Sequence, residues 1–380
     1  MKKSHLTLTI AALGLSLFLA EPARAQNVKE GMHSLLTPLR ELQPFIADQD
    51  EFSDPANKEK VGTLLQGLRT NFHSLENIPS RYQKVPGFKE NLTLMSDLLD
   101  DATRRFSEGR VSYAWWRARG IPSSCFACHA TYKVSTTYAN EGAIDPSLNN
   151  LERARFLLAT RQFAQAQEAL LQVLKDPNFR FSYDEALRNL LIVVTRINKS
   201  PNEGIALFKD VLATSKLPEE DAHEVRGWMQ SLEKWRAGKA PTEKDPLAAG
   251  EKLVVAGAAR GLEYYQDDVS LLRGTAMIHD VLEKESVTPE QRRRGLYLLG
   301  FAYSSLPGYF AESWAGMYLE QCINEFPGTK DAQRAYRVYR DMTAEEFTGS
   351  GGIHLPDEVQ LHLESLRQKA FGEPSFAGRV

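Results

Sequence analysis

Several features that would place this chain in a common functional class are scarce or missing. Cysteine occurs three times in 380 residues, so the cysteines cannot all form disulfide pairs. The 46 Lys and Arg residues nearly balance the 49 Asp and Glu residues, and the formal net charge of -3 gives no reason to expect a nucleic-acid partner. No interior apolar run is long enough to span a bilayer, which argues against a transmembrane segment. The length favours two or three domains.

The N-terminal segment has the pattern of a secretory signal peptide. Lys2 and Lys3 form a basic start, and residues 6–20 form an apolar stretch that is short for a membrane-spanning helix. The small-x-small triplet 23–25 then predicts cleavage before Gln26. We therefore expect residues 1–25 to be removed and the mature protein to be periplasmic or secreted.

Two of the three cysteines belong to the pentapeptide 125–129, Cys-Phe-Ala-Cys-His, which is the attachment pattern of a c-type haem. In a helix, thiols three residues apart lie on one face, where each can add to one vinyl group of the same porphyrin. The adjacent histidine then ligates the iron from the proximal side. The sequence therefore predicts one covalent haem c, with thioether bonds at Cys125 and Cys128 and with His129 as iron ligand.

Other uses of a Cys-x-x-Cys pair fit this sequence less well. A thioredoxin-like redox pair follows a strand in a βαβ unit, whereas the surroundings of Cys125 have helical patterning. A zinc site needs a second pair of ligands at a suitable spacing, and none follows Cys128. A structural disulfide does not require the histidine at position 129. Haem attachment is thus the favoured interpretation.

The residues before the pentapeptide predict an all-α domain. Apolar residues recur at intervals of three and four in three stretches, which predicts three amphipathic helices. Their apolar stripes are Val28, Met32, Leu35, Leu36, Leu39 and Leu42; Val61, Leu64, Leu65, Leu68, Phe72 and Leu75; and Leu92, Met95, Leu98, Leu99, Ala102 and Phe106. A fourth helix runs from about Val111 into the pentapeptide, with an interruption at Gly120-Ile121-Pro122. Four helices with short connections favour an antiparallel four-helix bundle over residues 26–140.

This arrangement resembles the class II c-type cytochromes, the family of cytochrome c prime and of the cytochrome c556 type. The resemblance depends on a Cys-x-x-Cys-His pattern on the last of four helices. It also depends on Tyr132-Lys133, which stands where the family commonly has tyrosine and a basic residue. It covers about residues 27–138 and implies the haem-binding roles given above. The break at 120–122 departs from the family, whose last helix is usually continuous.

The resemblance leaves open what occupies the second axial position of the iron. Some members of the family place a methionine from the first helix there, and Met32 lies on the first predicted helix; others leave the site open. A thioether ligand raises the reduction potential and suits electron transfer, although methionine also fills cores well. His33 is an alternative ligand, but it points about 100° away from Met32 around the helix. Met95 belongs to an apolar stripe and is expected in the core, and His73 has no supporting context.

The residues after the bundle predict a second helical domain. A linker at 141–150 is followed from Leu151 by one helical pattern after another, with no convincing strand alternation. Two segments, at about 154–177 and 296–327, share a frame of two helices closed by proline, and this frame resembles the tetratricopeptide repeat. We therefore expect helical repeats over residues 151–345; an irregular helical domain is the alternative.

Weaker copies of the frame fall at about 185–218 and 247–284. A stack of such helix pairs forms a concave surface that suits proteins or peptides. Residues 346–380 predict a loop and a capping helix. The glycine-rich part of the loop lacks the Lys-Ser/Thr of a phosphate-binding loop, so a phosphate-binding role is not expected. Cys322 falls at a small-residue position of a repeat, where burial in the core is expected rather than a regulatory thiol or a dimer crosslink.

Together these patterns predict an exported monohaem cytochrome with a helical bundle and a repeat domain. Electron transfer to or from a protein or peptide docked on the repeats is the leading expectation, and a homodimer through the bundle stays open. A haem-based gas sensor with an open distal site and an adaptor stabilised by its haem are the alternatives. No catalytic pattern appears among the scattered histidines, so enzymatic activity is not expected.

Overall fold

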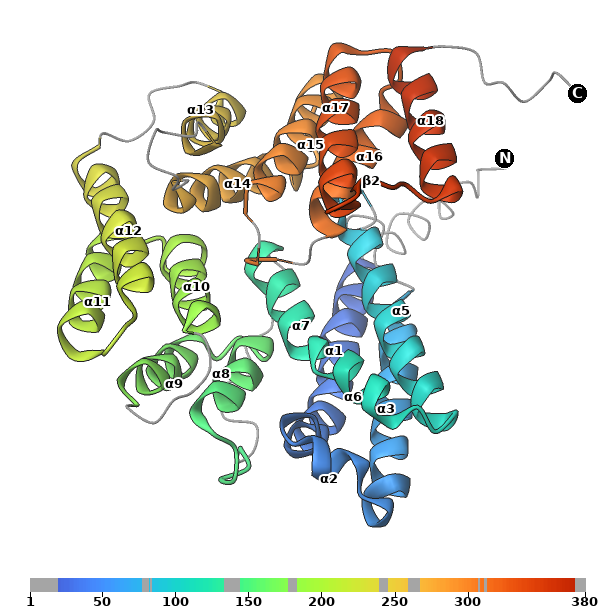
Figure 1. Cartoon of the computed structure of the whole chain (residues 1–380), viewed down its shortest axis with the longest axis vertical. Coiled ribbons are helices and arrows are strands. Elements are labelled where there is room, and N and C mark those ends of the chain that lie inside the picture. The colour runs from blue at the N-terminus through green and yellow to red at the C-terminus, as the bar shows by residue number, and fades with distance from the viewer. Residues whose placement is uncertain are drawn as a thin grey trace, which may run out of the picture. The chain divides into compact units, whose positions relative to one another are not determined.

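The computed structural model describes residues 20–76, 82, 84–132, 144–176, 183–238, 245–258, 267–306, 308–310 and 313–372, and most of these residues are helical (Figure 1). For residues 20–29 it describes the backbone alone. The all-α class is confirmed, and none of the helices in these segments is long and apolar enough to span a membrane. Residues 1–19 of the predicted signal peptide and residues 141–143 of the predicted linker lie outside the described residues.

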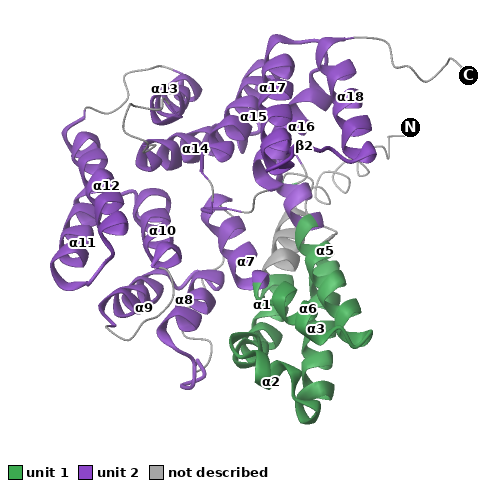
Figure 2. Cartoon of the chain, viewed as in Figure 1, with its two compact units in different colours: residues 1–83, 94–119 green, residues 84–93, 120–380 purple. Residues whose placement is uncertain are grey.

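The chain divides into two compact units (Figure 2). Unit 1 comprises Met1–Gln83 and Leu94–Arg119, and unit 2 comprises Lys84–Thr93 and Gly120–Val380. This division differs from the predicted boundary at residue 140, because the helix with the Cys-x-x-Cys-His pattern belongs to unit 2. Three of its apolar residues, Phe126, Ala127 and Ala130, are part of the hydrophobic core of that unit.

Unit 1 is a group of helices with short connections. Its elements are α1 (Ala20–Ala47), α2 (Gln49–Ser53), the 3-10 helix η1 (Pro55–Asn57), α3 (Lys58–His73), the 3-10 helix η2 (Ser74–Glu76), most of α5 (Phe88–Ser107) and α6 (Val111–Ala118). The helical segment after α2 starts at Pro55, because the Asp54 side chain accepts a backbone hydrogen bond and Pro55 occupies the first turn. The predicted apolar stripes form the core, since Leu42, Leu65 and Leu99 are almost fully buried.

Aromatic side chains fix how the helices of unit 1 pack. The rings of Phe52 and Phe106 meet edge to face, with centroids 5.4 Å apart. Trp115 of α6 donates its Nε1–H to the carbonyl oxygen of Ile46 in α1, at 3.1 Å. The indole therefore buries a large apolar surface while its polar atom keeps a partner.

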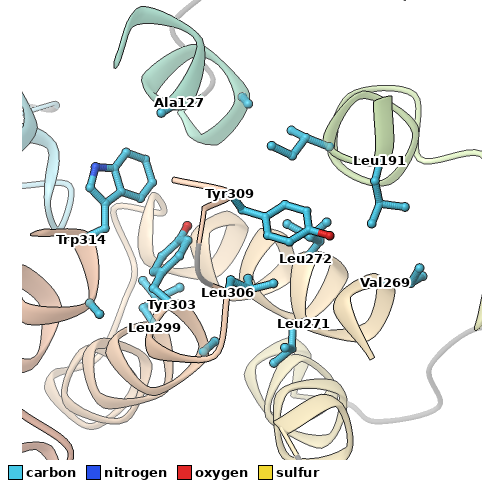
Figure 3. Close-up of a cluster of buried hydrophobic side chains, with 14 of the residues drawn as sticks. Ala127, Leu191, Val269, Leu271, Leu272, Leu299, Tyr303, Leu306, Tyr309 and Trp314 are labelled. Atoms are coloured by element: carbon cyan, nitrogen blue, oxygen red, sulfur yellow. The ribbon is translucent and has the colours of Figure 1, made fainter. Parts of the chain in front are cut away.

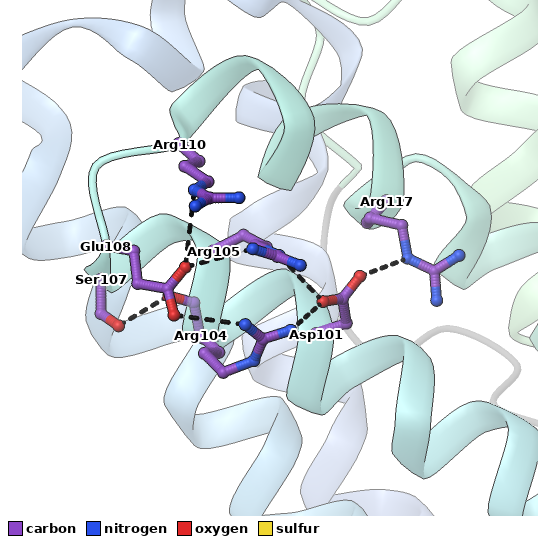
Figure 4. Close-up of polar contacts among 7 residues, drawn as sticks. All are labelled: Asp101, Arg104, Arg105, Ser107, Glu108, Arg110 and Arg117. Carbon is purple, nitrogen blue, oxygen red and sulfur yellow. Dashed lines mark hydrogen bonds and ion pairs between the residues drawn. The ribbon is translucent and has the colours of Figure 1, made fainter.

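Charged side chains join α5 to α6 on the surface of unit 1 (Figure 4). Asp101 is bound by three arginines, with distances of 2.6 Å to Arg104, 3.3 Å to Arg105 and 3.2 Å to Arg117. Burial raises the pKa of Asp101, but hydrogen bonds from Tyr113 and Arg105 and the charges of Arg117 and Arg104 outweigh it, so the pKa lies below its ordinary value. The carboxylate therefore stays ionised and holds Arg117 of α6 against α5.

Unit 2 is a longer series of helices. Besides the start of α5 it contains α7 (Gly120–Thr131), α8 (Asn150–Ala159), α9 (Phe163–Lys175), α10 (Asp184–Ile192), the π-helical turn η3 (Val193–Ile197), α11 (Pro201–Thr214), α12 (Glu219–Ala237), α13 (Pro246–Ala258), α14 (Asp268–Leu282), α15 (Pro289–Ser304), α16 (Ser313–Glu325), α17 (Lys330–Glu346) and α18 (Asp357–Phe371). Helices that follow one another pack as pairs: α8 with α9, α11 with α12, α13 with α14, and α15 with α16. This succession is compatible with a helical-repeat arrangement.

Small residues let these paired helices approach closely. A Cβ atom at Gly300 would lie 2.5 Å from Cγ of Leu319, so the contact between α15 and α16 requires glycine. Cys322 of α16 is 0% exposed, and its Sγ lies 3.6 Å from the carbonyl oxygen of Arg293. The predicted core position of Cys322 is confirmed, and burial raises the pKa of its thiol to about 12.

One hydrophobic core runs through unit 2 and reaches α7. Figure 3 shows part of this cluster, in which Ala127 of α7 lies with Leu191 of α10, Leu272 of α14 and Tyr303 of α15. Residues far apart in the sequence thus bury apolar surface together. This shared burial stabilises α7 as a part of unit 2.

The last described residues form a hairpin and a helix. Strand β1 (Thr348–Gly349) pairs antiparallel with β2 (Gly352–Ile353), and Gly352 has a φ of 103°, which favours glycine. The glycine-rich segment, expected as a loop, is therefore a short hairpin. The predicted final helix is confirmed as α18, which packs on α16 and α17 through buried residues such as Leu366.

Candidate functional site

The Cys-x-x-Cys-His pattern lies on α7, a helix that begins after a break. Helix α6 ends at Ala118, Arg119 follows it, and α7 begins at Gly120. Pro122 occupies the first turn of α7, where its missing N–H leaves no hydrogen bond unmade. An interruption is therefore found, but at Arg119, one residue before the predicted positions 120–122, which form the first turn of α7.

The helix places three side chains with haem-binding chemistry on one face. At 100° per residue, Cys125, Cys128 and His129 fall within about 100° of one another around α7. Ala127 and Ala130 fall on the opposite side and are buried. One side of α7 is thus anchored in the core, and the other presents two thiols and an imidazole together.

The imidazole of His129 has the protonation state of a metal ligand. Burial, and next the positive charge of Arg161, lower the pKa of His129 to about 3, against a smaller opposing effect of a hydrogen bond to the backbone of Ala159. The ring is therefore neutral at neutral pH, which is the form that ligates metals. Its Nδ1 atom is buried without a hydrogen-bond partner among the residues that the structure describes.

The two thiols of α7 are free and protonated. Burial, with the neighbouring Cys128, raises the pKa of Cys125 to about 12. Burial also raises the pKa of Cys128 to about 12, against the positive charge of Arg161 and with the negative charge of Glu283. A thioredoxin-like pair needs a lowered thiol pKa to attack a disulfide. The environment of these cysteines therefore disfavours that alternative.

Tyr132, which follows α7 directly, holds the end of the helix inside unit 2. Its hydroxyl lies 2.9 Å from the hydroxyl of Tyr318 and accepts a hydrogen bond from Nδ2 of Asn91 at 3.0 Å. The Tyr132 ring packs edge to face on Phe88, with centroids 5.2 Å apart. The tyrosine that carried part of the family resemblance therefore anchors α7 to α16 and to the start of α5. Lys133, its partner in that resemblance, lies outside the described residues.

A buried arginine, Arg196, also contacts the end of α7, and sequence reasoning missed it. It is 4% exposed, and its Nη1 donates to Oγ1 of Thr131 at 2.9 Å. Its Nη2 donates to Oγ1 of Thr275 and to the hydroxyl of Tyr303, both at 3.0 Å. No ion pair joins it to a carboxylate among the residues that the structure describes. The signal in the sequence is its place at the end of the uninterrupted apolar run 190–194.

The π-helical turn explains how an arginine comes to lie there. In η3 the backbone N–H of Asn198 bonds to the carbonyl oxygen of Val193, five residues earlier, at 2.9 Å. The wider turn rotates the side chains that follow it around the helix axis. Different positions therefore face the core in η3 than in α10. Arg196 is thereby directed into unit 2, where His279 bonds to the same Tyr303 hydroxyl at 2.9 Å.

The other candidate ligands lie in unit 1. Met32 is half-buried on α1, and His33 is half-buried beside it. Met95 is buried, which confirms its expected core position. His73 lies 2.9 Å from Oδ1 of Asp100 and so belongs to a surface ion-pair group. The structure therefore brings Cys125, Cys128 and His129 together in one helix, and ligation of the iron by Met32 stays a prediction.

A second group of ionisable residues in unit 2 lies away from the α7 pattern in sequence. Ligand atoms of Asp184, Asp221 and Glu224 all lie within 4.8 Å of one another, a spacing that suits a cation. Burial, and next the charge of Asp268, raise the pKa of Glu224 to about 7. The carboxylates thus repel one another, which lowers the stability of the fold when all are ionised.

The stability of the protein should therefore depend on pH through Glu224. The folded chain keeps a proton on Glu224 up to about pH 7, whereas an exposed glutamate releases it near its ordinary pKa of 4.5. The contribution of this retained proton to the free energy of unfolding is fully present below pH 4.5. It is lost as the pH rises through about 7. After allowance for solvent screening, we expect Glu224→Gln to raise the free energy of unfolding by about 1–2 kcal/mol at about pH 8, with little change at about pH 4.

Urea denaturation at the two pH values measures this effect. The matched control is Glu233→Gln, an exposed position on the same helix, α12, and it should change neither value. An equal gain from Glu224→Gln at both pH values would contradict the raised pKa of Glu224.

The α7 site thus has the donor set of a haem attachment site on one helix, held by Tyr132 and Arg196 inside a helical unit. No protein-family model matches this chain, and no curated protein or solved structure matches it.

Proposed function

We propose that this chain is an exported monohaem c-type cytochrome that exchanges electrons with a protein partner docked on the helices of unit 2. Haem c would be bound at Cys125 and Cys128, with His129 on the iron. The observation that carries the proposal is that two free, protonated thiols and a neutral imidazole share one face of α7. The scattered histidines elsewhere in the chain offer no comparable set.

The residues present fit this group. Cys125 and Cys128 would each hold the group through one thioether bond, in which the thiol would be added across a vinyl double bond and its proton would end on the neighbouring vinyl carbon. This addition needs no oxidant or reductant. The neutral His129 ring offers a nitrogen lone pair to the iron. When bound, haem c supplies a one-electron couple between ferrous and ferric iron.

The rest of the chain supports electron exchange between proteins. The proposal takes the helices of unit 1 together with α7 as a bundle of the class II c-type cytochrome kind, and Met32 on α1 is our proposed sixth ligand. The helix pairs of unit 2 are compatible with tetratricopeptide-like repeats, and stacked helices of that kind would form a surface for a protein partner. The signal-peptide pattern of residues 1–25 would bring the chain to the periplasm or the medium, where covalent attachment prevents loss of the haem.

The test is the spectrum of the full chain produced in cells competent in cytochrome c maturation. Haem staining after a denaturing gel reports covalent attachment, and ferric and ferrous spectra report the spin state. We expect a covalently bound, six-coordinate, low-spin haem. Met32→Leu should convert nearly all of it to a high-spin form, because leucine has no lone pair for iron, whereas Met95→Leu in the buried stripe of α5 should leave it low-spin.

Two other results would change the proposal. A parent protein that is high-spin and binds CO when reduced would remove Met32 as ligand and favour the gas-sensor alternative. A stained gel without haem, from cells that mature a known c-type cytochrome, would overturn the proposal itself.

A further inference from the structure

The turn between α8 and α9 has an unusual backbone at Arg161. Helix α8 ends at Ala159, and α9 begins at Phe163. Within this turn Arg161 has a φ of 61°, in the left-handed region that favours glycine or asparagine. An arginine held in this conformation costs free energy, so its side chain is expected to compensate through its contacts.

The contacts of Arg161 are with the end of the site helix. Its Nη2 donates to the carbonyl oxygen of His129 at 3.1 Å and to that of Tyr132 at 3.4 Å. The last carbonyl groups of a helix lack intrahelical partners and carry the negative end of the helix dipole. The guanidinium therefore caps the C-terminal end of α7, and one of the two carbonyls that it binds belongs to His129 itself.

The charge of Arg161 also reaches the side chains of the site. The Nη2 atom of Arg161 lies 3.1 Å from the carbonyl oxygen of His129, the residue that we propose as iron ligand. A guanidinium stays protonated at all ordinary pH values, so this positive charge is permanent. A ferric centre carries one more positive charge than a ferrous centre. A fixed cation beside the proximal ligand therefore disfavours the ferric state.

We propose that Arg161 is a positioning residue that holds the His129 end of α7 and, by its charge, shifts a haem bound there toward the ferrous form. This inference rests on the proposed haem attachment. It assigns to the first helix pair of the repeat unit a direct influence on the reduction potential. The turn of a repeat thereby acts on the redox centre, beyond any role in docking a partner.

The experiment is a potentiometric titration of the purified, haem-loaded full chain with three substitutions at residue 161. Arg161→Gln removes the charge, and we expect the ferrous/ferric equilibrium to shift about tenfold toward ferric, a fall of about 59 mV in midpoint potential. Arg161→Gly also removes the charge but relieves the backbone conformation, so it should show the same fall without a loss of thermal stability. Arg161→Lys keeps the charge and should keep most of the potential. Arg153→Gln, at an exposed position of α8, is the control and should keep all of it.

The outcomes separate this inference from the proposed function. A parent chain without covalent haem rejects the proposed function. Haem-loaded Gln and Gly variants with the parent potential overturn the role of Arg161. If the Gln variant does not accumulate, the Gly variant alone decides, because it tests the charge without the backbone cost.

Discussion

A Cys125→Ala, Cys128→Ala double variant should lose all covalently bound haem, whereas Cys322→Ala should keep the parent amount. The two α7 thiols share one face of a helix with His129, and Cys322 is fully buried against the carbonyl oxygen of Arg293 in another part of unit 2. Haem staining of a denaturing gel measures the loss, because only covalent haem survives denaturation. Each single variant should retain a stained band through its remaining thioether bond, with a reduced spectrum shifted by the unsaturated vinyl group.

The same variants separate the electron-transfer proposal from the adaptor alternative. A partner that is isolated with the parent chain and still binds the double variant would favour an adaptor, because binding would then not need the haem. Haem retention by the double variant after denaturation would contradict attachment at Cys125 and Cys128.

Much of the secondary structure could be predicted because its signals are local. Asp54 and Pro55 mark the start of a helical segment, Gly120 and Pro122 mark a break, and each acts through hydrogen bonds or dihedral limits within a few residues. The close approach at Gly300 could also be predicted, because a small residue in an apolar stripe indicates a neighbouring helix. These features follow from the chain within one or two turns.

The partner of each buried face could not be predicted in the same way. The pattern of α7 shows that Phe126 and Ala130 are buried, but an apolar face fits the core of a bundle as well as that of a repeat unit. In the structure this face of α7 is buried in the core of unit 2, together with residues from later helices such as Leu191 and Tyr303. Arg161 was missed for a related reason, because its role depends on a left-handed backbone and on carbonyl groups about thirty residues earlier in the chain.

Tyr303→Phe should lower the free energy of unfolding by about 2–3 kcal/mol, although it removes a single oxygen atom. That hydroxyl accepts a hydrogen bond from the buried guanidinium of Arg196 at 3.0 Å and bonds to Nε2 of His279 at 2.9 Å. Burial, and next the charge of Arg196, lower the pKa of His279 well below its ordinary value, so the ring stays neutral and does not compensate. Without the hydroxyl, a buried cation loses one of its neutral acceptors, and an imidazole nitrogen loses its partner.

Denaturant unfolding with a double-mutant cycle tests whether the guanidinium is the reason for this cost. Tyr297→Phe is the control on the same helix, α15, because no hydrogen bond to its hydroxyl occurs among the described residues, and it should change stability by less than about 0.5 kcal/mol. In an Arg196→Met background, Tyr303→Phe should cost at least about 1 kcal/mol less, because no charge is left without an acceptor. An equal loss of free energy of unfolding in both backgrounds would show that the Tyr303 hydroxyl stabilises the protein only through its hydrogen bond with His279. A lower cost would show that Arg196, which also binds Thr131 at the end of α7, depends on Tyr303 for the solvation of its charge. The stability of unit 2 and the placement of α7 would then depend on the same buried group.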